Sequence, residues 1–421
     1  MKYSGIKWIG KIPDNWKLNK IGQLFNLRNE KVSDKDYSPL SVSKGGIVPQ
    51  MENVAKSDAS DDRKLVLKGD FAINSRSDRK MSCGVSPLDG SVSLINTILY
   101  PKNNDVIYND YMNYLLKNYG FAEEFYRWGH GIVADLWTTK WQEMKSIMLP
   151  LPSVQKQKAT YDFLNQKTEE IDSLIEIENQ QIEMLKEYVE SSIYEYLKKE
   201  LGVSINDMSF ESRTSMKKIG ALSNLVTKQT GFDYSNTIKP TMLDNPNEDS
   251  LPYLQTRNFK NNYFNLNTEF YVPKSTWEQF PKLILDDETL LFSIVGASIG
   301  NVAIFPKSEK AFLGGAICRV NLVDKEYALF IKEIMLSKFG QEQINRKINS
   351  NAQGTITVQN VRDFLIPMPS KKDAVRIGQK CASMRKEVDD LITIKEKKIY
   401  VLTEYKKSLI YEYVTGKKEV C

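Results

Sequence analysis

The amino-acid sequence contains one long segment twice, at a constant offset of 217 positions that takes Pro150 to Pro367. Each copy begins with Pro-x-Pro-Ser, and the two copies then align without a gap near 155–199 and 372–415. A segment that is repeated after each of two unlike stretches predicts a chain built as two halves with a shared frame.

Each copy has the apolar spacing of a coiled coil. Apolar side chains follow steps of four and three residues, at Ile171, Ile175, Ile182 and Leu185 in the first copy and at Val388, Ile392, Ile399 and Leu402 in the second. This alternation is the pattern by which two helices pack side by side. Neither copy contains proline after its Pro-x-Pro start, and Gly202 and Gly416 follow at positions that favour a helix end. We therefore predict two long helices that act as a spacer and as a docking surface for partners.

One position of the predicted seam carries opposite charges in the two copies, Glu178 in the first and Lys395 in the second. If the two helices pack against each other, these side chains lie on the same track and can pair. A charge pair at a seam position tends to fix the register of two helices more than it stabilises them. The alternative interpretation is that both side chains extend into solvent.

Composition limits the class of protein. With 421 residues, 41% of them hydrophobic, the chain can bury more than one core. The formal net charge of +5 permits an anionic partner without requiring one. The four scattered cysteines, the lack of a leader and the lack of an apolar run long enough for a bilayer predict a cytoplasmic protein. The single histidine, His130, lies in a glycine-rich loop, which disfavours a histidine-based metal site or catalytic triad.

The stretches that precede the two repeated segments have the pattern of mixed strand and helix. Short apolar runs bounded by turn residues predict strands near 65–67, 71–73, 92–95 and 289–295. The domain organisation that we predict is a globular domain at 1–150, a central helical spacer at 151–200, a second globular domain at 212–367 and a C-terminal helical spacer at 368–421. The expected fold class is α+β, with two mixed α/β domains joined by two long helices.

Three features together give the sequence a family resemblance. The chain opens with Gly-Ile-Lys-Trp-Ile-Gly-Lys-Ile-Pro-Asp-Asn-Trp at 5–16, it has two Pro-x-Pro helix starts, and unlike stretches alternate with repeated ones. In this it resembles the specificity (S) subunit of type I restriction–modification systems along essentially its whole length. The second half departs from the pattern, because Met-Ser-Phe-Glu-Ser at 208–212 stands where a second tryptophan-rich opening would be. A single N-terminal copy is compatible with the family.

The resemblance implies an architecture and a set of partners. Each globular domain would be a target-recognition domain that reads one half of a bipartite sequence in double-stranded DNA. The helices would run antiparallel as a coiled coil, set the spacing between the half-sites and bind two modification (methyltransferase) subunits. Restriction (translocase and nuclease) subunits would join them in the full complex, and no membrane is involved. The chain would then have an internal pseudo-twofold repeat that matches a split DNA target.

The motifs of the reactions themselves are missing from the sequence. The glycine-rich stretch 296–301 lacks the Lys-Ser/Thr end of a P-loop. The turn at 244–247 is not the Asn-Pro-Pro-aromatic motif of amino-methyltransferases, and no pattern indicates a metal-dependent nuclease. We therefore predict a non-catalytic subunit without catalytic or metal-ligating residues and without a cofactor of its own. S-adenosylmethionine, ATP and magnesium would be bound by partner subunits.

Two other functions compete with DNA recognition. A coiled-coil scaffold whose globular domains bind other proteins is the main alternative, because the modest net charge leaves it open. A salt-dependent affinity for duplex DNA would argue against that alternative. A DNA-modifying enzyme that acts by itself is disfavoured by the missing motifs.

Candidate DNA-binding residues follow from the chemistry of base and phosphate recognition. Arg and Lys suit guanine and phosphate, Asn and Gln suit adenine, and Ser and Thr suit any of these. Such residues gather in polar segments, at Lys44, Ser75, Arg76, Arg79, Lys80, Thr138 and Lys140 in the first domain and at Thr256, Arg257, Asn258, Lys260, Ser298, Gln353 and Thr355 in the second. Ordinary solvated loops are the alternative interpretation of each segment.

Overall fold

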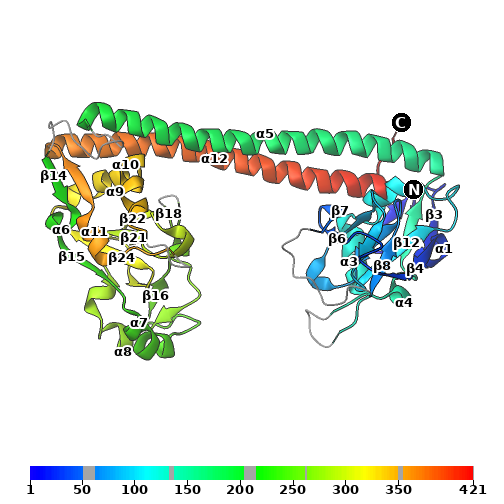
Figure 1. Cartoon of the computed structure of the whole chain (residues 1–421), viewed down its shortest axis with the longest axis horizontal. Helices are drawn as coiled ribbons and strands as arrows, with labels where there is room; N and C mark the ends of the chain where they lie inside the picture. Colours follow the sequence, from blue (N-terminus) through cyan, green and yellow to red (C-terminus); the bar gives the residue numbers. More distant parts are fainter. Residues whose placement is uncertain (51–61, 132–136, 203–214, 261–262, 349–353, 421) are drawn as a thin grey trace. The chain divides into compact units, whose positions relative to one another are not determined.

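The computed structural model describes residues 1–50, 62–131, 137–202, 215–260, 263–348 and 354–420. The chain divides into two compact units, where unit 1 comprises 1–178 with 397–421 and unit 2 comprises 179–396. Each unit combines one globular domain with part of each long helix (Figure 1). The sequence-based boundaries place the helices in segments of their own, and those boundaries stay a prediction.

The two long helices are present close to their predicted bounds. Helix α5 spans Val154–Leu201 and helix α12 spans Lys371–Val414. Gly202 and Gly416 come after them with φ angles of 67° and 71°. Glycine adopts this left-handed conformation without the steric cost of a side chain, so each helix ends next to a glycine as predicted.

In unit 1 the two helices run antiparallel. Lys406 Nζ lies 2.6 Å from a carboxylate oxygen of Asp172, and Lys398 Nζ lies 2.6 Å from a carboxylate oxygen of Glu178. The residue number on α12 falls as the number on α5 rises, which defines the direction. Ile171 of the predicted seam is buried in the core of this unit.

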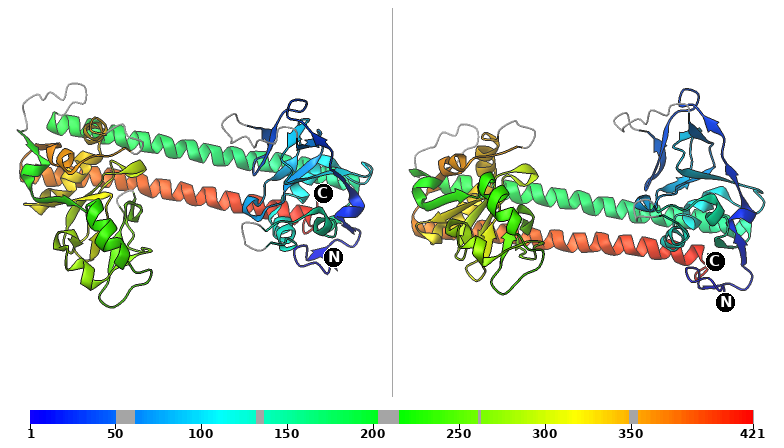
Figure 2. Two further views of the ribbon diagram at one scale, coloured as in Figure 1. Left: turned by 60° about the horizontal axis from the view of Figure 1, so that its bottom comes forward. Right: turned by 90° about the horizontal axis from the view of Figure 1, so that it is seen from below.

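Unit 2 shows the same antiparallel packing. Arg385 Nη1 lies 2.5 Å from Glu190 Oε1, and Lys395 donates a hydrogen bond to Gln181. Val388 of the predicted seam is buried in the core of this unit. Both views in Figure 2 show α5 and α12 next to each other. The expectation of an antiparallel coiled coil is therefore confirmed.

The charged seam positions have partners that the sequence did not predict. Glu178 is 5% exposed and accepts a hydrogen bond from Lys398 at 2.6 Å. Lys395 donates to Gln181, and Gln181 is the repeat equivalent of Lys398. The two hydrogen bonds are thus equivalent within the repeat, and the alternative that both charges extend into solvent is wrong. A direct pair between Glu178 and Lys395 stays a prediction.

Each unit contains a four-stranded antiparallel sheet with the same strand order. In unit 1 the order is β10-β9-β12-β4, with strands Cys83–Val85, Phe71–Asn74, Asn96–Pro101 and Phe25–Arg28. In unit 2 the order is β22-β21-β24-β15, with strands Val302–Phe305, Thr289–Ser293, Ile317–Leu322 and Ser223–Lys228. The repeat therefore extends from the helices to the globular domains, and the α+β fold class is confirmed.

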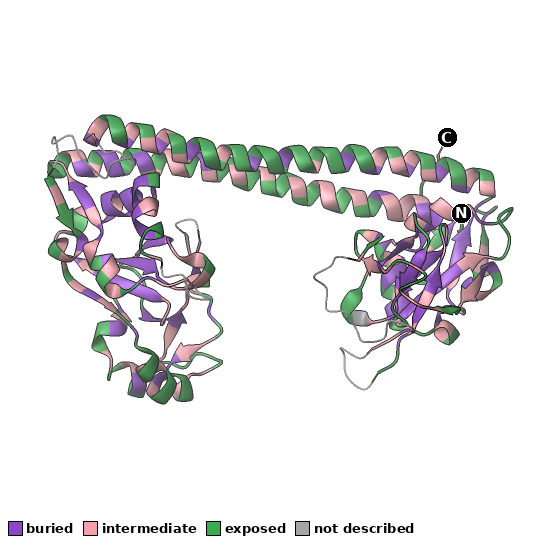
Figure 3. Cartoon of the chain, in the orientation of Figure 1, coloured by how far each residue is buried: buried purple, intermediate pink, exposed green. Residues whose placement is uncertain are grey.

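Smaller sheets and short helices complete each unit. Unit 1 has β1 (Lys2–Tyr3) with β2 (Lys11–Ile12), β3 (Lys17–Lys20) with β13 (Met148–Leu151), β6 (Leu40–Ser43) with β7 (Gly46–Pro49), the sheet β11-β8-β5 (Gly90–Val92, Arg63–Val66 and Lys31–Val32), and helices α1 (Ile21–Leu24), α2 (Met112–Leu115), α3 (Tyr119–Arg127) and α4 (Trp141–Met144). Unit 2 has β14 (Ser215–Lys218) with β25 (Leu365–Met368), β17 (Phe259–Lys260) with β18 (Tyr263–Phe264), the sheet β19-β16-β23-β20 (Tyr271–Val272, Leu251–Leu254, Ala311–Leu313 and Ile284–Leu285), and helices α6 (Ile219–Leu222), α7 (Gly231–Asp233), α8 (Lys274–Trp277), α9 (Ala328–Leu336), α10 (Lys338–Asn345) and α11 (Val358–Asp363). In Figure 3 the buried residues of each unit gather on the four-stranded sheet and the helices that cover it.

One strand prediction is wrong. The stretch 92–95 is not a strand, because β11 ends at Val92 and the chain turns before β12 begins at Asn96. Asn96 closes the turn, since its backbone and its side-chain amide both donate to the Ser93 carbonyl, at 3.0 and 2.9 Å. An apolar run does not report a turn that a single asparagine side chain stabilises.

The N-terminal opening motif packs against the end of α12 in unit 1. Trp8 and Trp16 are buried in the same core as Val414, the last residue of that helix. Tyr411 donates a hydrogen bond from its hydroxyl to the Trp8 carbonyl at 2.8 Å. A β-carbon at Gly416 would approach Pro13 Cδ within 2.4 Å, so the turn after α12 and the opening motif fit closely. The N-terminal opening motif and the C-terminal end of α12 therefore pack in one core.

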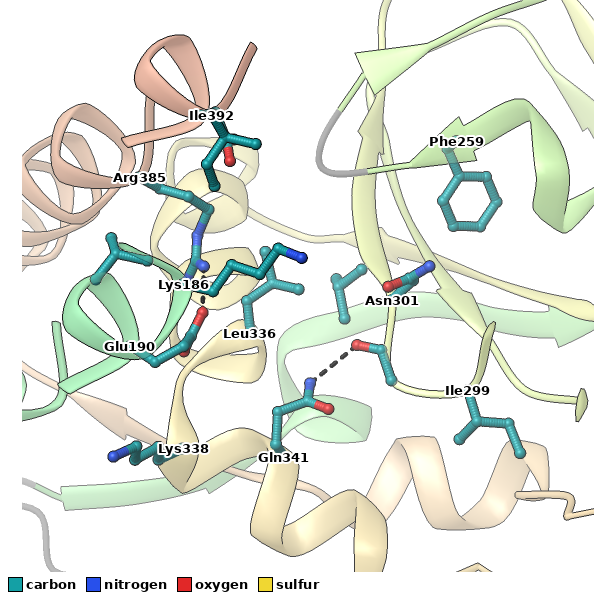
Figure 4. Close-up of a pocket in the computed structure, with 14 residues that line it drawn as sticks. Lys186, Glu190, Phe259, Ile299, Asn301, Leu336, Lys338, Gln341, Arg385 and Ile392 are labelled. Carbon is teal, nitrogen blue, oxygen red and sulfur yellow. Dashed lines mark hydrogen bonds and ion pairs between the residues drawn. The ribbon is translucent and has the colours of Figure 1, made fainter. Parts of the chain in front are cut away.

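In unit 2, an arginine whose side chain is only 11% exposed joins both long helices to the globular domain. Arg385 of α12 contacts Glu190 of α5 at 2.5 Å and Glu333 of α9 at 3.0 Å, and Glu333 is only 1% exposed. Burial acts to lower the pKa of Arg385, but Glu333 and Glu190 raise it above its ordinary value. Figure 4 shows Arg385 and Glu190 beside a cavity of about 460 Å³ between these helices and the domain. This ion pair fixes the domain on its helices.

Replacing Arg385 with Met should weaken unit 2 far more than an equivalent change at the surface. Glu333 would lose the cation at its Oε2 and keep only Lys332, whose Nζ lies 3.1 Å from its Oε1. Removing one partner of a buried ion pair costs about 3 kcal/mol. Hydrogen exchange of the α9 amides, followed by mass spectrometry, should report a fall of that size in the opening free energy. Arg376→Met is the control, because Arg376 pairs with Glu200 at an exposed position. Equal exchange in the two variants would contradict the role given to Arg385.

Candidate nucleic-acid interface

In unit 1, two candidate segments that are distant in sequence lie side by side. The first is hairpin 1, residues 75–82, which connects β9 to β10 and contains the short helix η1 (Ser77–Arg79). The second is the segment around Thr138. Arg76 and Thr138 form an antiparallel bridge, and the Thr139 N–H donates to the Ser75 carbonyl at 3.0 Å. The structure thus brings the predicted residues 75–80 and 138–140 together.

Unit 2 repeats this arrangement at hairpin 2, residues 294–301, which connects β21 to β22 and contains η8 (Gly296–Ser298). Val295 forms an antiparallel bridge with Thr355, and the Ile356 N–H donates to the Ile294 carbonyl at 3.0 Å. Thr355 is the repeat equivalent of Thr138. The same backbone frame therefore holds the candidate residues of both domains.

The two hairpins carry different side chains on that frame. Their ends are closed by equivalent hydrogen bonds, from Asn74 N–H to Ser82 and from Ser293 N–H to Asn301, both at 2.9 Å. Hairpin 1 places Arg76, Arg79 and Lys80 on the turn, whereas hairpin 2 places Gly296, Ala297 and Ser298 there. A shared frame with different side chains is what two domains need if they read different sequences.

Hairpin 1 is cationic, and acidic neighbours position its cations. The Arg79 side chain is 68% exposed and lies 3.6 Å from Asp78, which also lies 3.3 Å from Arg76. Lys80 pairs with Glu123 of α3 at 3.0 Å. Such pairs at the surface contribute little to stability, so their cations can turn to a phosphate at small cost. Arg79 is the most exposed cation of hairpin 1.

Hairpin 2 is neutral and offers backbone groups instead. Gly296 and Gly300 flank Ser298 with φ angles of 76° and 94°. Gln341 of α10 donates to the Gly300 carbonyl at 2.9 Å, and Figure 4 draws this bond beside the cavity. A turn with so few bulky side chains allows a phosphate to approach backbone amides closely.

The third candidate segment, at 255–260, is a tight turn around η6 (Thr256–Asn258). Asn258 is 4% exposed and holds the turn, because its amide donates to the Asn265 carbonyl at 2.9 Å. Arg257 is exposed and pairs with Glu269 at 3.0 Å. Its hydrogen bond lowers the pKa of the Glu269 carboxyl. Among the described side chains of this segment, those of Gln255, Thr256 and Arg257 are the ones that a ligand can contact.

The other predicted residues are dispersed. Lys44 is exposed in the turn between β6 and β7, and Lys140 is exposed at the start of α4. Ser75 is 7% exposed and bonded to Thr97 at 3.1 Å, so its side chain lies in the interior. Lys260 lies on β17, and Gln353 lies outside the described residues.

Sequence reasoning missed a cavity in unit 2. The cavity has a volume of about 420 Å³ and is lined by Gln229, Tyr253, Gln255 and Thr256, among others. Only Thr256 was predicted. The available signal was the polar run Lys-Gln-Thr at 228–230, which follows the apolar residues of β15.

A second missed surface lies on the long helices. Large apolar residues that are 44% to 67% exposed occur at repeat-equivalent positions, at Leu174, Ile177, Met184 and Tyr188 on α5 and at Leu391, Ile394, Val401 and Tyr405 on α12. They stand one position before or two positions after a seam residue, so they flank the seam on one side of each helix. The predicted residues Ile171, Ile175, Ile182, Leu185, Val388, Ile392, Ile399 and Leu402 form the seam itself and are buried or half-buried. The sequence signal for this surface was that Leu174 recurs as Leu391 and Tyr188 recurs as Tyr405.

No group of three or more His, Cys, Asp or Glu residues able to hold a metal ion occurs in the part of the chain that the structure describes. In the same part, none of the helices combines the length and the apolar character needed to cross a bilayer. Cys83, Cys318 and Cys381 are buried free thiols, and burial raises the pKa of each to about 12.

Known proteins resemble the chain in sequence and in fold. Residues 232–404 match the type I restriction modification DNA specificity domain. The chain is 24% identical to the putative type I restriction enzyme MjaX specificity subunit of Methanocaldococcus jannaschii, over 98% of this chain and 96% of that protein. It is 22% identical to the MjaVIII specificity subunit of the same organism, over 66% of this chain and 63% of that protein.

One solved chain has a similar fold, with a TM-score of 0.70 and 10% identity over 96% of this chain and 98% of that one. It comes from a study of complex assembly and conformational transition in a type I restriction–modification system. By its sequence the chain is thus similar to type I restriction–modification specificity subunits, and the solved chain shares its overall fold. The chain is therefore a DNA-specificity component rather than a catalytic subunit.

Replacing Arg79 with Ala should weaken duplex binding by about the same factor for every sequence. Loss of one phosphate contact should also reduce the slope of log affinity against log salt by about 1. The measurement is a salt titration of duplex affinity with the chain in complex with its partner subunits. Lys68→Ala is the control, because Lys68 is exposed before β9 whereas hairpin 1 follows it. An unchanged slope for Arg79→Ala would remove hairpin 1 from the interface.

Proposed function

We propose that each globular domain of this specificity subunit reads one half of a bipartite target in double-stranded DNA. The observation that supports this most is the repeated frame of hairpin and threonine segment, which carries Arg79 in one domain and Ser298 in the other. A common frame with unlike contact residues suits two half-sites of different sequence. Arg79 and Lys80 would contact phosphate or guanine, and Ser298 would contact phosphate.

The long helices set the spacing between the half-sites in this proposal. Helices α5 and α12 are uninterrupted over 48 and 44 residues. Both contribute to the core of unit 1 and to the core of unit 2. A continuous helix is stiff and has a constant rise per residue, so its length fixes the distance between its ends. A flexible loop would not fix that distance.

The exposed apolar residues beside the seam are the docking surface for two modification subunits. In an antiparallel pair, the flanking positions of the two helices lie on the same side. Unit 1 then presents a face made of Leu174, Ile177, Val401 and Tyr405, and unit 2 presents an equivalent face made of Leu391, Ile394, Met184 and Tyr188. An amphipathic helix of a partner could cover each face. Two equivalent faces favour two copies of one partner.

The proposal assigns the catalytic reactions to the partner subunits. S-adenosylmethionine would be bound by the modification subunits, and ATP and magnesium by the restriction subunits of the full complex. A complex that acts on chromosomal DNA would work in the cytoplasm. Similarity to specificity subunits disfavours the alternative of a scaffold whose domains bind only proteins.

The direct test is methylome sequencing of a host that carries the modification subunit, with and without this chain. The expected result is a split motif of adenine methylation that appears only when the chain is present. The control is copurification of the two proteins, which shows that the complex has formed. Copurification without any chain-dependent methylation would contradict the proposed function and favour the scaffold.

Charging one docking face should remove one copy of the modification subunit. Tyr405→Glu places a carboxylate on the face of unit 1, and Tyr188→Glu does so on the face of unit 2. Each variant should keep one copy, and the double variant should keep none, because burying an unpaired carboxylate is costly. Native mass spectrometry of the purified complexes gives the stoichiometry.

Tyr400→Glu is the matched control. Tyr400 is 66% exposed on α12, but it lies off the proposed face, and its repeat equivalent on α5 is already a glutamate, Glu183. This variant should retain two copies. A single-face variant that retains both copies, or that loses both at once, would show that the faces are not separate docking sites.

A further inference from the structure

The cavity lined by Gln229 in unit 2 is formed where three parts of the second domain meet. Gln229 follows β15, Tyr253 lies on β16, and the glycine pair 314–315 lies in the loop between β23 and β24. Figure 1 labels β15, β16 and the neighbouring helix α7. A β-carbon at Gly314 would approach the Leu254 carbonyl within 2.2 Å, so glycine is required for this wall of the cavity.

A buried glutamine in the cavity wall has an unsatisfied donor. Gln229 is 2% exposed, and its Oε1 accepts a hydrogen bond from the Tyr253 hydroxyl at 2.8 Å. Its Nε2 has no hydrogen-bond partner among the described residues. A buried N–H group without an acceptor is costly and rare in a folded protein. This amide is therefore the group in the cavity that a ligand would satisfy.

Tyr253 determines which end of the carboxamide remains available. The Tyr253 hydroxyl oxygen accepts from the Gly315 N–H at 3.4 Å, which leaves its own hydrogen for Gln229 Oε1. Burial raises the pKa of Tyr253 to about 12, so the hydroxyl stays protonated and keeps donating near neutral pH. Gln229 is thereby held as a donor, with its acceptor already in use.

The cavity adjoins the candidate DNA-contacting segments of the second domain. Thr256 lines it, and Ala316, also in its wall, accepts a backbone hydrogen bond from Ile294 of hairpin 2 at 2.9 Å. Phe232, next to the lining residue Gly231, is 76% exposed. A cavity that combines apolar surface with a few polar groups, beside an exposed aromatic ring and a recognition turn, fits a nucleobase better than it fits a protein side chain.

We infer that Gln229 is a specificity-determining residue of the second domain, which donates its amide hydrogens to guanine. This rests on the proposed function. Guanine presents two acceptors, O6 and N7, at its major-groove edge, whereas adenine and cytosine present a donor there. A glutamine that is free to rotate accepts from and donates to adenine. Tyr253 removes that option, so the pair selects the acceptor edge of guanine, with the single acceptor of thymine second.

The test is the methylated motif of the complex with Gln229→Leu and with Tyr253→Phe. Gln229→Leu should make one guanine position of one half-site degenerate. Tyr253→Phe should allow adenine at the same position, because the carboxamide can then rotate. The other half-site and the spacing should stay unchanged in both. Gln279→Leu is the control, since the Gln279 amide bonds the Ser275 carbonyl within its own helical turn.

A chemical change in the DNA gives an independent readout. Wild-type complex should bind a duplex with 7-deazaguanine at that position about tenfold more weakly, and Gln229→Leu should not distinguish the two duplexes. If Gln229→Leu fails to copurify with its partner, Tyr253→Phe carries the test. An unchanged motif in a variant that copurifies would overturn the inference but leave the proposed function intact. Absence of any split motif with the wild-type chain would overturn both.

Discussion

The seam between α5 and α12 is the contact on which the other elements depend. A helix pair with this many charged residues has only a narrow apolar stripe, and most of the stability of a helix in a protein comes from packing of its apolar face. The stripe becomes stable because the globular domains cover its ends. Ile171 is part of the core of unit 1, and Val189 and Leu197 are part of the core of unit 2. Each domain therefore folds onto its own part of the two helices, and that part of the helices is in turn stabilised by the domain.

The two joints between helix and domain occupy equivalent places but differ in chemistry. In unit 2, Arg385 meets Glu333, which stands four residues before the N-cap of α10. In unit 1 the repeat equivalent of Arg385 is Thr168, and it bonds at 3.1 Å to Tyr114, four residues before the N-cap of α3. Each globular domain therefore supplies the residue that bonds to its own position on the helices, Glu333 in unit 2 and Tyr114 in unit 1. Moving the second domain onto the first position would place Glu333 opposite a threonine, with Lys332 in place of two cations, and removing one partner of a buried ion pair is costly. Exchanging a globular domain between the two positions would therefore also require substitutions where the domain meets the helices.

The sequence predicted what depends on local pattern and missed what depends on distant contacts. Helix bounds and their glycine ends were predictable, because a seven-residue pattern repeats over each whole helix. The contact of Arg76 with Thr138 was not, because nothing in either segment encodes the other. Residue type alone also could not separate Asn258, which holds a turn from inside, from Arg257, which is exposed beside it. The donor role of Gln229 depends on a tyrosine hydroxyl from another strand, so only the fold could reveal it.

The backbone of the hairpins shows why such a frame can change its specificity without refolding. Hairpin 2 uses Gly300 at a position with φ of 94°, and hairpin 1 has Met81 at the equivalent position with φ of 66°. A residue with a side chain pays about 1 kcal/mol for that conformation. Unit 1 tolerates this strain, so the hairpin shape is imposed by the hydrogen bonds at its base and by the threonine segment beside it. Those bonds involve only backbone atoms. The side chains at the turn, such as Arg79 and Ser298, are consequently free to vary, and DNA sequence preference can vary with them.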